Sequence, residues 1–218
     1  MKMSETTIEM PDQAVTLDAF VGEPEGHQIG TVIFAHGSGS SRHSSRNQHV
    51  ASIIQREGLR TVLLDLLTPE EDAVDVRTRE HRFDIPMLAR RVVGAIDWLN
   101  RTEPDAGPIG LFGASTGAAA ALIAAAERPL EVSAVVSRGG RPDLAEAALP
   151  AVEAPTLLIV GGNDPVVIDL NRSAERQMTA DTRLEIVPGA THLFEEPGKL
   201  DIVAELATEF FCTHMTGR

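Results

Sequence analysis

Three polar residues have the types and the order needed to cleave an ester. A serine nucleophile needs a base, and the base needs an acid to orient it. Ser115 lies in the pattern GASTG (113–117), between an apolar run and an alanine-rich segment, and Asp164 and His192 follow two later apolar runs. A G-x-S-x-G turn between a strand and a helix is typical of a nucleophile elbow. The spacing therefore predicts acyl transfer through Ser115, with His192 as base and Asp164 as acid.

Each of these residues also has a simpler interpretation. The glycines of 113–117 would let a small-residue helix pack closely on a sheet. Asp164 would cap the helix that Pro165 opens, and His192 would be a solvated loop histidine. Asp143 is a second candidate acid, because it follows the preceding strand. Three catalytic residue types in the right order, each at the carboxyl end of a strand, nevertheless favour the catalytic interpretation.

The loop HGSGSSRHSSRN (36–47) follows another apolar run and offers backbone N–H groups to a bound anion. One interpretation is a nucleotide-binding oxidoreductase, in which Gly37-Ser38-Gly39 begins a G-x-G-x-x-G motif and Asp65 binds a ribose. However, Arg42 takes the place of the third glycine, so the close approach of the backbone to a pyrophosphate is lost. This interpretation also leaves the serine, aspartate and histidine without a role. We therefore favour an anion that forms only during a reaction.

Arginines follow two of the strands that lie nearest to the serine. Arg42 and Arg46 follow the glycines of the loop 36–47. Arg138 and Arg141 follow the strand 132–137, which is the next strand after Ser115 in the chain. We take Arg42 and Arg138 as candidate pocket residues, because a guanidinium binds a substrate carboxylate or phosphate through two parallel hydrogen bonds. The alternative, which we favour, is ion pairing with acidic neighbours in the fold.

The three catalytic candidates each follow a continuous apolar run, which is typical of a buried parallel strand. Two alternating runs at 6–10 and 15–21 precede these and predict antiparallel edge strands. The continuous apolar runs are 31–35, 60–66, 108–112, 132–137, 156–160 and 183–187. We therefore predict an α/β fold with a mostly parallel, twisted sheet of about eight strands.

Segments with helical periodicity separate these runs, so helices should cover both faces of the sheet. They are 48–57, 84–100, 116–127, 143–148, 167–178 and 199–211. Ligands bind at the carboxyl ends of the strands in such a sheet. Little sequence remains for a lid, so we expect a minimal cap or none. The longest irregular stretch, 67–83, is interpreted either as a partial cover or as a solvated loop.

Over nearly its whole length the chain resembles the α/β-hydrolase superfamily, and most of all its small dienelactone-hydrolase-like branch. The resemblance rests on the segments HGSG (36–39), GASTG (113–117), GND (162–164) and ATHLFEE (190–196). It implies the α/β-hydrolase fold and a serine–aspartate–histidine triad. Dienelactone hydrolases proper use a cysteine nucleophile, whereas this chain has Ser115 at the elbow. The resemblance therefore supports the fold and the triad rather than dienelactone as the substrate.

The expected reaction also needs an oxyanion hole, which consists of N–H donors aimed at charge that develops in the transition state. One donor is the residue after the nucleophile, Thr116. By resemblance to H-G-x loops, the other is Ser38. We predict hydrolysis of small carboxylic esters, lactones or thioesters through an acyl-enzyme on Ser115. The non-enzymatic alternative is a hydrolase fold that serves only as a binding module.

Composition limits the partners of the chain. Its 218 residues suffice for one buried α/β core, so we predict a single domain, 1–218. A net charge of −13 leaves no basic excess for nucleic acid. One cysteine, Cys212, excludes an internal disulfide, and the lack of an H-E-x-x-H pair argues against a metal site, so we expect no cofactor. We find no signal peptide or membrane span, and expect a soluble, cytoplasmic monomer or homodimer.

Overall fold

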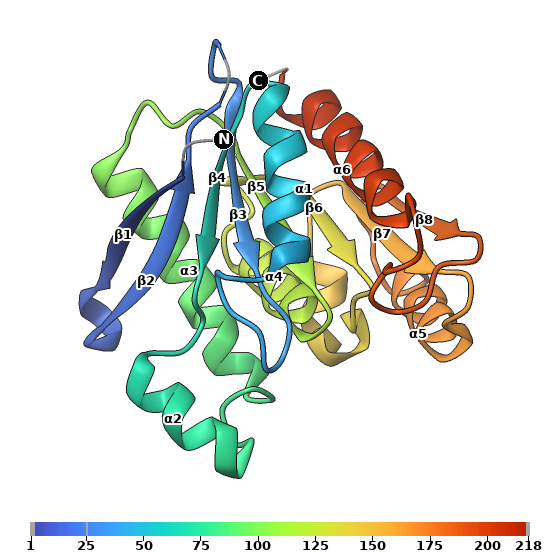
Figure 1. Cartoon of the computed structure of the whole chain (residues 1–218), viewed down its shortest axis with the longest axis horizontal. Coiled ribbons are helices and arrows are strands. Elements are labelled where there is room, and N and C mark those ends of the chain that lie inside the picture. Colours follow the sequence, from blue (N-terminus) through green and yellow to red (C-terminus); the bar gives the residue numbers. More distant parts are fainter. Residues whose placement is uncertain (1–2, 25, 217–218) are drawn as a thin grey trace.

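The computed structural model describes residues 3–24 and 26–216, and an eight-stranded sheet forms its centre (Figure 1). The strands are β1 (Met3–Met10), β2 (Val15–Gly22), β3 (Gly30–Ala35), β4 (Leu59–Leu64), β5 (Ile109–Ala114), β6 (Val132–Arg138), β7 (Thr156–Gly161) and β8 (Thr182–Val187). Their order across the sheet is β1-β2-β4-β3-β5-β6-β7-β8. β2 is antiparallel to both of its neighbours, whereas all pairs from β4 to β8 are parallel. The predicted fold class is confirmed.

Helices cover both faces of this sheet (Figure 1). They are α1 (Ser45–Arg56), α2 (Pro69–Thr78), α3 (Ile85–Thr102), α4 (Thr116–Glu127), α5 (Pro165–Glu175) and α6 (Lys199–Met215), with 3-10 turns η1 (Pro11–Gln13) and η2 (Pro142–Ala151). α1 and α6 pack on one face, and α3 and α4 pack on the other. α2 differs from these, because it lies beyond the carboxyl ends of the strands (Figure 1). No helix in the described part of the chain is long and apolar enough to cross a membrane.

The continuous apolar runs have a direct cause in this layering. Successive side chains of a strand point to opposite faces, so a strand covered on both faces needs apolar residues throughout. In β3, Ile33 packs with the α3 and α4 side, and the next residue, Phe34, packs with the α1 and α6 side. Phe34 there contacts Phe112 of β5, with ring centroids 4.7 Å apart. The apolar runs therefore mark the strands whose ends form the site.

Two local predictions need correction. α1 begins at Ser45 rather than at 48, because the Ser44 side chain accepts the N–H of Asn47 and caps the helix. The stretch 67–83 is not irregular, since it contains α2. Thr68 and Glu71 form a capping box around this helix start, with a proline in the first turn. The letters TPEE at 68–71 carry this signal in the sequence.

Candidate active site

Ser115 lies on a tight turn between β5 and α4, and its backbone has an unusual conformation. Its φ and ψ angles are 52° and −120°, which a residue with a Cβ rarely adopts. A Cβ on Gly113 would lie 2.4 Å from Cα of Ala118, and one on Gly117 would lie 2.3 Å from the carbonyl oxygen of Ala35. Both glycines are therefore required for the close approach of helix and sheet. The turn has the geometry of a nucleophile elbow.

Asp164 and His192 meet in the loops that follow β7 and β8. Oδ2 of Asp164 lies 2.8 Å from Nδ1 of His192. The competing acid, Asp143, is engaged elsewhere, because both of its carboxylate oxygens accept hydrogen bonds from Arg141 at 2.8 Å. Asp164 is therefore the carboxylate that contacts the histidine. The other ring nitrogen, Nε2, is left for a further partner.

Ser115 and His192 line the same pocket, which has a volume of about 230 Å³. The pocket lies at the carboxyl edge of the sheet, between the loop 36–47, the first turn of α1 and the end of β6. The His192 side chain is 38% exposed, so its ring is accessible from this pocket. Within residues 3–24 and 26–216, no group of three or more His, Cys, Asp or Glu side chains is placed to hold a metal ion. The arrangement suits nucleophilic attack on a small group.

The glycine loop packs directly against the elbow. A Cβ on Gly37 would lie 3.0 Å from Cβ of Ser115, and the next residue, Ser38, lines the pocket. Thr116 is the first residue of α4, where a backbone N–H has no acceptor within the helix. The structure thus places Ser38 in the pocket with Ser115, and Thr116 directly after Ser115 at the start of α4. Their role as oxyanion donors stays a prediction.

His36 holds the start of this loop in place. Its ring is 7% exposed, and Nε2 accepts the N–H of Leu66 at 3.1 Å. Nδ1 must then carry the hydrogen, which it donates to the carbonyl oxygen of Gly37 at 2.9 Å. Burial lowers the pKa of His36 below the usual histidine value. The ring therefore stays neutral near pH 7, as its contact with Leu66 requires.

Arg42 does not line the pocket, so its candidate assignment to the substrate site is wrong and the ion pairing that we favoured describes it better. Its guanidinium forms a short hydrogen bond to Asp65 and an ion pair with Asp18 at 3.3 Å, and it lies over the Phe20 ring, 5.2 Å from the centroid. The backbone N–H of Arg42 also donates to Asp65, at 2.5 Å. Ion pairing is thus the correct interpretation of Arg42. Because Asp65 is engaged in these contacts, it is not available to bind a ribose.

Arg138, the other arginine assigned to the pocket, does line it. The residue is only 7% exposed, and its guanidinium donates to Oδ1 of Asn47 at 3.2 Å. Its Nε has no hydrogen-bond partner in the described part of the chain. Burial and the nearby positive charge of Arg46 lower the pKa of Arg138 to about 10. The guanidinium remains protonated at pH 7, so a buried positive charge faces the pocket.

Arg46 is a second cation of the pocket, which the sequence analysis did not select. It lies in the first turn of α1, four residues after Arg42. Its ion pair with Glu195 spans 3.4 Å, and the Glu195 side chain is 63% exposed, so solvent screens this contact. The sequence gives no signal that separates Arg46 from Arg42, because the fold of the loop decides which side chain faces the serine.

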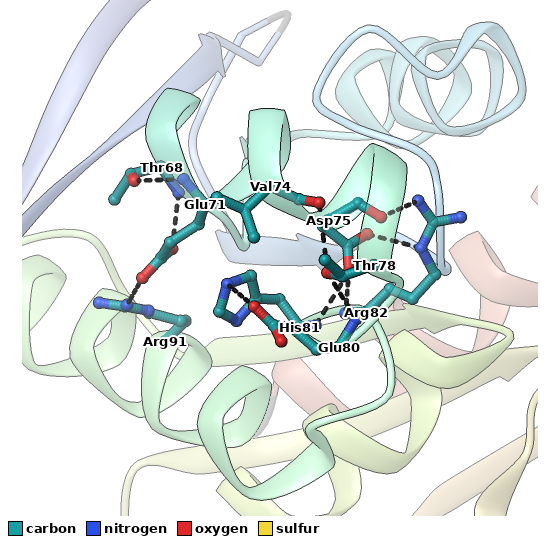
Figure 2. Close-up of polar contacts among 9 residues, drawn as sticks. All are labelled: Thr68, Glu71, Val74, Asp75, Thr78, Glu80, His81, Arg82 and Arg91. Atoms are coloured by element: carbon teal, nitrogen blue, oxygen red, sulfur yellow. Dashed lines mark hydrogen bonds and ion pairs between the residues drawn. The ribbon is translucent and has the colours of Figure 1, made fainter.

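The helix α2 is tethered at two points, as Figure 2 shows. Asp75 is 1% exposed and accepts the backbone N–H groups of His81 and Arg82 at 2.9 Å each, and Nε of Arg82 at 2.5 Å. Glu71 pairs with Arg91 of α3 at 2.7 Å. Burial disfavours the carboxylate of Asp75, but the hydrogen bonds from Arg82 and His81 outweigh it and hold the pKa of Asp75 below its usual value. The segment is therefore an anchored helix.

The tethered segment 67–83 also reaches the glycine loop, through Arg82. A Cβ on Gly39 would lie 3.1 Å from Nη1 of Arg82, so the guanidinium packs against this loop. The same segment carries two exposed apolar side chains, Val76 at 66% and Phe83 at 58%. No residue of the segment 67–83 lines the pocket around Ser115, so a partial cover by this segment stays a prediction.

Comparison with known proteins identifies similar sequences and folds. A family model described as the dienelactone hydrolase family matches residues 17–213. The solved structure of a dienelactone hydrolase from Anabaena variabilis is 54% identical, with a TM-score of 0.93 and 98% of each chain covered. A serine hydrolase without a lid from Xanthomonas campestris is 21% identical, with a TM-score of 0.78 over 100% of this chain and 97% of that chain. The last comparison shows the fold alone.

Curated relatives from Mycobacterium tuberculosis carry a different name. They are called putative phosphoribosyl transferases, and one is 56% identical over 190 residues. The match covers 86% of this chain but only 42% of that relative. The chain therefore spans less than half the length of the curated relatives it matches, and the larger part of each lies outside the match.

Proposed function

Because the chain belongs to the dienelactone hydrolase family, we propose that it is a serine hydrolase of small carboxylic esters, lactones or thioesters. One observation carries the proposal. The Asp164–His192 hydrogen bond of 2.8 Å lies at a pocket that also contains Ser115 on its strained turn. These are the parts of a nucleophile, a base and an orienting acid, in the chain order that the α/β-hydrolase fold uses.

In the proposed mechanism, Oγ of Ser115 attacks the ester carbonyl while Nε2 of His192 takes the hydroxyl proton. Asp164 accepts the Nδ1–H of His192, which fixes the tautomer and stabilises the imidazolium. The N–H groups of Ser38 and Thr116 donate to the tetrahedral oxyanion. The imidazolium then protonates the leaving alkoxide, and a water molecule, deprotonated by His192, cleaves the acyl-enzyme.

The size of the pocket favours small substrates. Its volume of about 230 Å³ lies below the range of roughly 300–1,000 Å³ that is usual for sites of drug-sized ligands. No residue of the segment 67–83 lines the pocket, so this segment would not enclose bulkier groups. We therefore propose short acyl groups rather than long lipid chains.

The name of the mycobacterial relatives does not decide the function of this chain. A phosphoribosyl transferase activity of those proteins could reside in the larger part that this chain does not match. The alternative of a non-catalytic binding module requires that the folded chain hydrolyse no ester. Direct assay separates these possibilities.

The test is the hydrolysis of p-nitrophenyl acetate and butyrate by wild type, Ser115→Ala and the control Ser173→Ala, which lies on α5 outside the pocket. We expect wild type and the control to have equal kcat/KM, and Ser115→Ala to lose about 10⁴-fold or more. Full activity of Ser115→Ala would refute the proposed nucleophile. A folded wild type without activity on any ester would instead favour the binding module.

A further inference from the structure

The pocket beside Ser115 differs in charge from the rest of the molecule. The chain has 32 acidic and 19 basic residues, yet the pocket is lined by Arg46, Arg138 and no acidic residue. Hydrolysis of a neutral ester needs neither arginine, because the nucleophile, base, acid and oxyanion donors are all accounted for. The two cations therefore require a separate explanation.

Arg138 is the more informative of the two. Its guanidinium is nine-tenths buried, its one hydrogen-bond partner in the described part of the chain is the neutral Asn47, and Nε is unpartnered. Burial of a charge without a counter-charge is strongly unfavourable. The adjacent Arg46 increases this cost, because the two positive charges repel and lower the pKa of Arg138. A bound anion would remove both penalties.

The first turn of α1 adds further donors at the same place. Ser44 caps this twelve-residue helix, and Ser44, Arg46 and Asn47 all line the pocket. Backbone N–H groups in a first turn lack acceptors within the helix, and the positive end of the helix dipole favours an anion. Ser40 also lines the pocket beside these residues. The buried Arg138, whose Nε has no partner in the described part of the chain, and this helix start therefore line one pocket.

We propose that Arg46, Arg138 and the first turn of α1 bind a phosphate group that the ester substrate carries beside its scissile bond. This proposal rests on the proposed function and adds the substrate class. One arginine fork suffices for a carboxylate, whereas two guanidiniums, hydroxyls and helix N–H groups match a tetrahedral dianion. The phosphate is recognised and not cleaved, so the reaction remains acyl transfer to water.

The test compares three acetate esters that differ only in the alcohol: 2-acetoxyethyl phosphate, 3-acetoxypropanoate and the neutral 2-methoxyethyl acetate. Wild type should have the highest kcat/KM on the phosphate ester, mainly through a lower KM. Arg46→Gln and Arg138→Gln should lower kcat/KM on the phosphate ester at least tenfold more than on the neutral ester. A charge-assisted hydrogen bond is worth about 10- to 100-fold in binding, which sets this expectation.

Arg42→Gln is the matched control, because Arg42 follows the same loop but pairs with Asp65 outside the pocket. It should change kcat/KM on all three esters by the same factor. If Arg138→Gln does not fold, Arg46→Gln still decides, since its side chain is 33% exposed in the first turn of a helix. Equal losses on all three esters would overturn the subsite. A carboxylate ester that equals or exceeds the phosphate ester would overturn the assignment to phosphate.

A binding measurement distinguishes an error in the proposed phosphate subsite from an error in the proposed hydrolase activity. Calorimetric titration of Ser115→Ala with inorganic phosphate measures the anion site without any hydrolysis. Binding that is lost in the double variant Ser115→Ala/Arg46→Gln supports the subsite even if no ester tested is a substrate. Hydrolysis of the neutral ester, with no phosphate binding and no preference among esters, leaves the hydrolase intact and overturns the subsite.

Discussion

Two hollows at the carboxyl edge of the sheet contain arginines from the same loop, and they differ in how charge is balanced. The hollow around Arg42 has a volume of about 250 Å³ and is lined by Asp18, Asp65 and Asp72. The pocket around Ser115 is similar in size, at about 230 Å³, but Arg138 and Arg46 face it without an acidic residue in its lining. Arg42 is paired with two aspartates, whereas Arg138 has no counter-charge and Arg46 has only the exposed Glu195. We propose that the charge left unbalanced at the Ser115 pocket serves binding.

The same contrast separates the two candidate acids. Asp143 is neutralised by Arg141, with two hydrogen bonds of 2.8 Å, whereas Asp164 contacts His192 at the pocket. A carboxylate held by an arginine has a partner that keeps its charge. A carboxylate held by a histidine stabilises a charge that appears only during the reaction. Charge balance thus points to functional residues on both the acidic and the basic side.

Replacement of each aspartate by asparagine, in separate variants, tests this contrast and has the largest expected effect. Asp164→Asn should lower kcat on p-nitrophenyl acetate by about 10⁴-fold, because the amide favours the wrong histidine tautomer. Asp143→Asn, which disturbs only the contact with Arg141, should lower kcat less than threefold. Steady-state kinetics of both variants decides the matter. A large loss in Asp143→Asn with activity kept in Asp164→Asn would reverse the assignment of the acid.

Replacement of Arg42 tests the structural half of the comparison. Arg42→Met should lower the free energy of unfolding by about 1–3 kcal/mol, because Asp65 is left without its charge partner in a half-buried position. Urea denaturation followed by circular dichroism measures this change. A stability equal to that of wild type would show that the contacts of Arg42 are not structurally important.

The same replacement at Arg138 should act in the opposite direction. Arg138→Met removes a buried charge that has no counter-charge, and a methionine fills a similar volume. We expect the free energy of unfolding to rise by about 1 kcal/mol, while any preference for phosphate esters is lost. Denaturation of the two methionine variants under one condition gives the comparison directly. If both variants were destabilised to the same extent, Arg42 and Arg138 would contribute equally to stability, which would contradict the difference proposed between the two hollows.

The smallest expected effect is a pH dependence at His36, which lines the hollow around Arg42. In the unfolded chain His36 binds a proton near pH 6.5, but in the folded chain burial holds its pKa lower. The unfolded state thus binds more protons below pH 6.5, so stability falls as the pH falls. This loss should be less than about 0.5 kcal/mol between pH 6.5 and 6.0, and His36→Gln should not show it. An identical pH slope in the two proteins would exclude His36 as its source.

The sequence predicted the parts of the site that depend on chain order. The helix at Thr116–Glu127 has the predicted bounds, and the strand ends place Ser115, Asp164 and His192 as expected. Parallel strands buried on both faces leave a clear apolar signal, and their carboxyl ends must meet at one edge. This geometry follows from the apolar pattern of the strands and from the order of the elements along the chain.

The arginines could not be predicted in the same way. Whether Arg42 or Arg46 faces Ser115 depends on Asp18 and Asp65, which come from β2 and from the end of β4 and are distant in sequence. A loop without periodicity carries no signal for side-chain direction. The prediction of the segment that contains α2 failed for a different reason. Its capping box is visible in the sequence, but its many charged residues suggested a loop.

Ser115 is the proposed nucleophile, activated by His192 and Asp164. Treatment of the folded protein with a fluorophosphonate, followed by intact-mass measurement and peptide mapping, tests this proposal most directly. We predict one adduct, located on Ser115, that is absent in Ser115→Ala and strongly reduced in Asp164→Asn. An unlabelled wild type, or an adduct on another residue that persists in Ser115→Ala, would contradict the account.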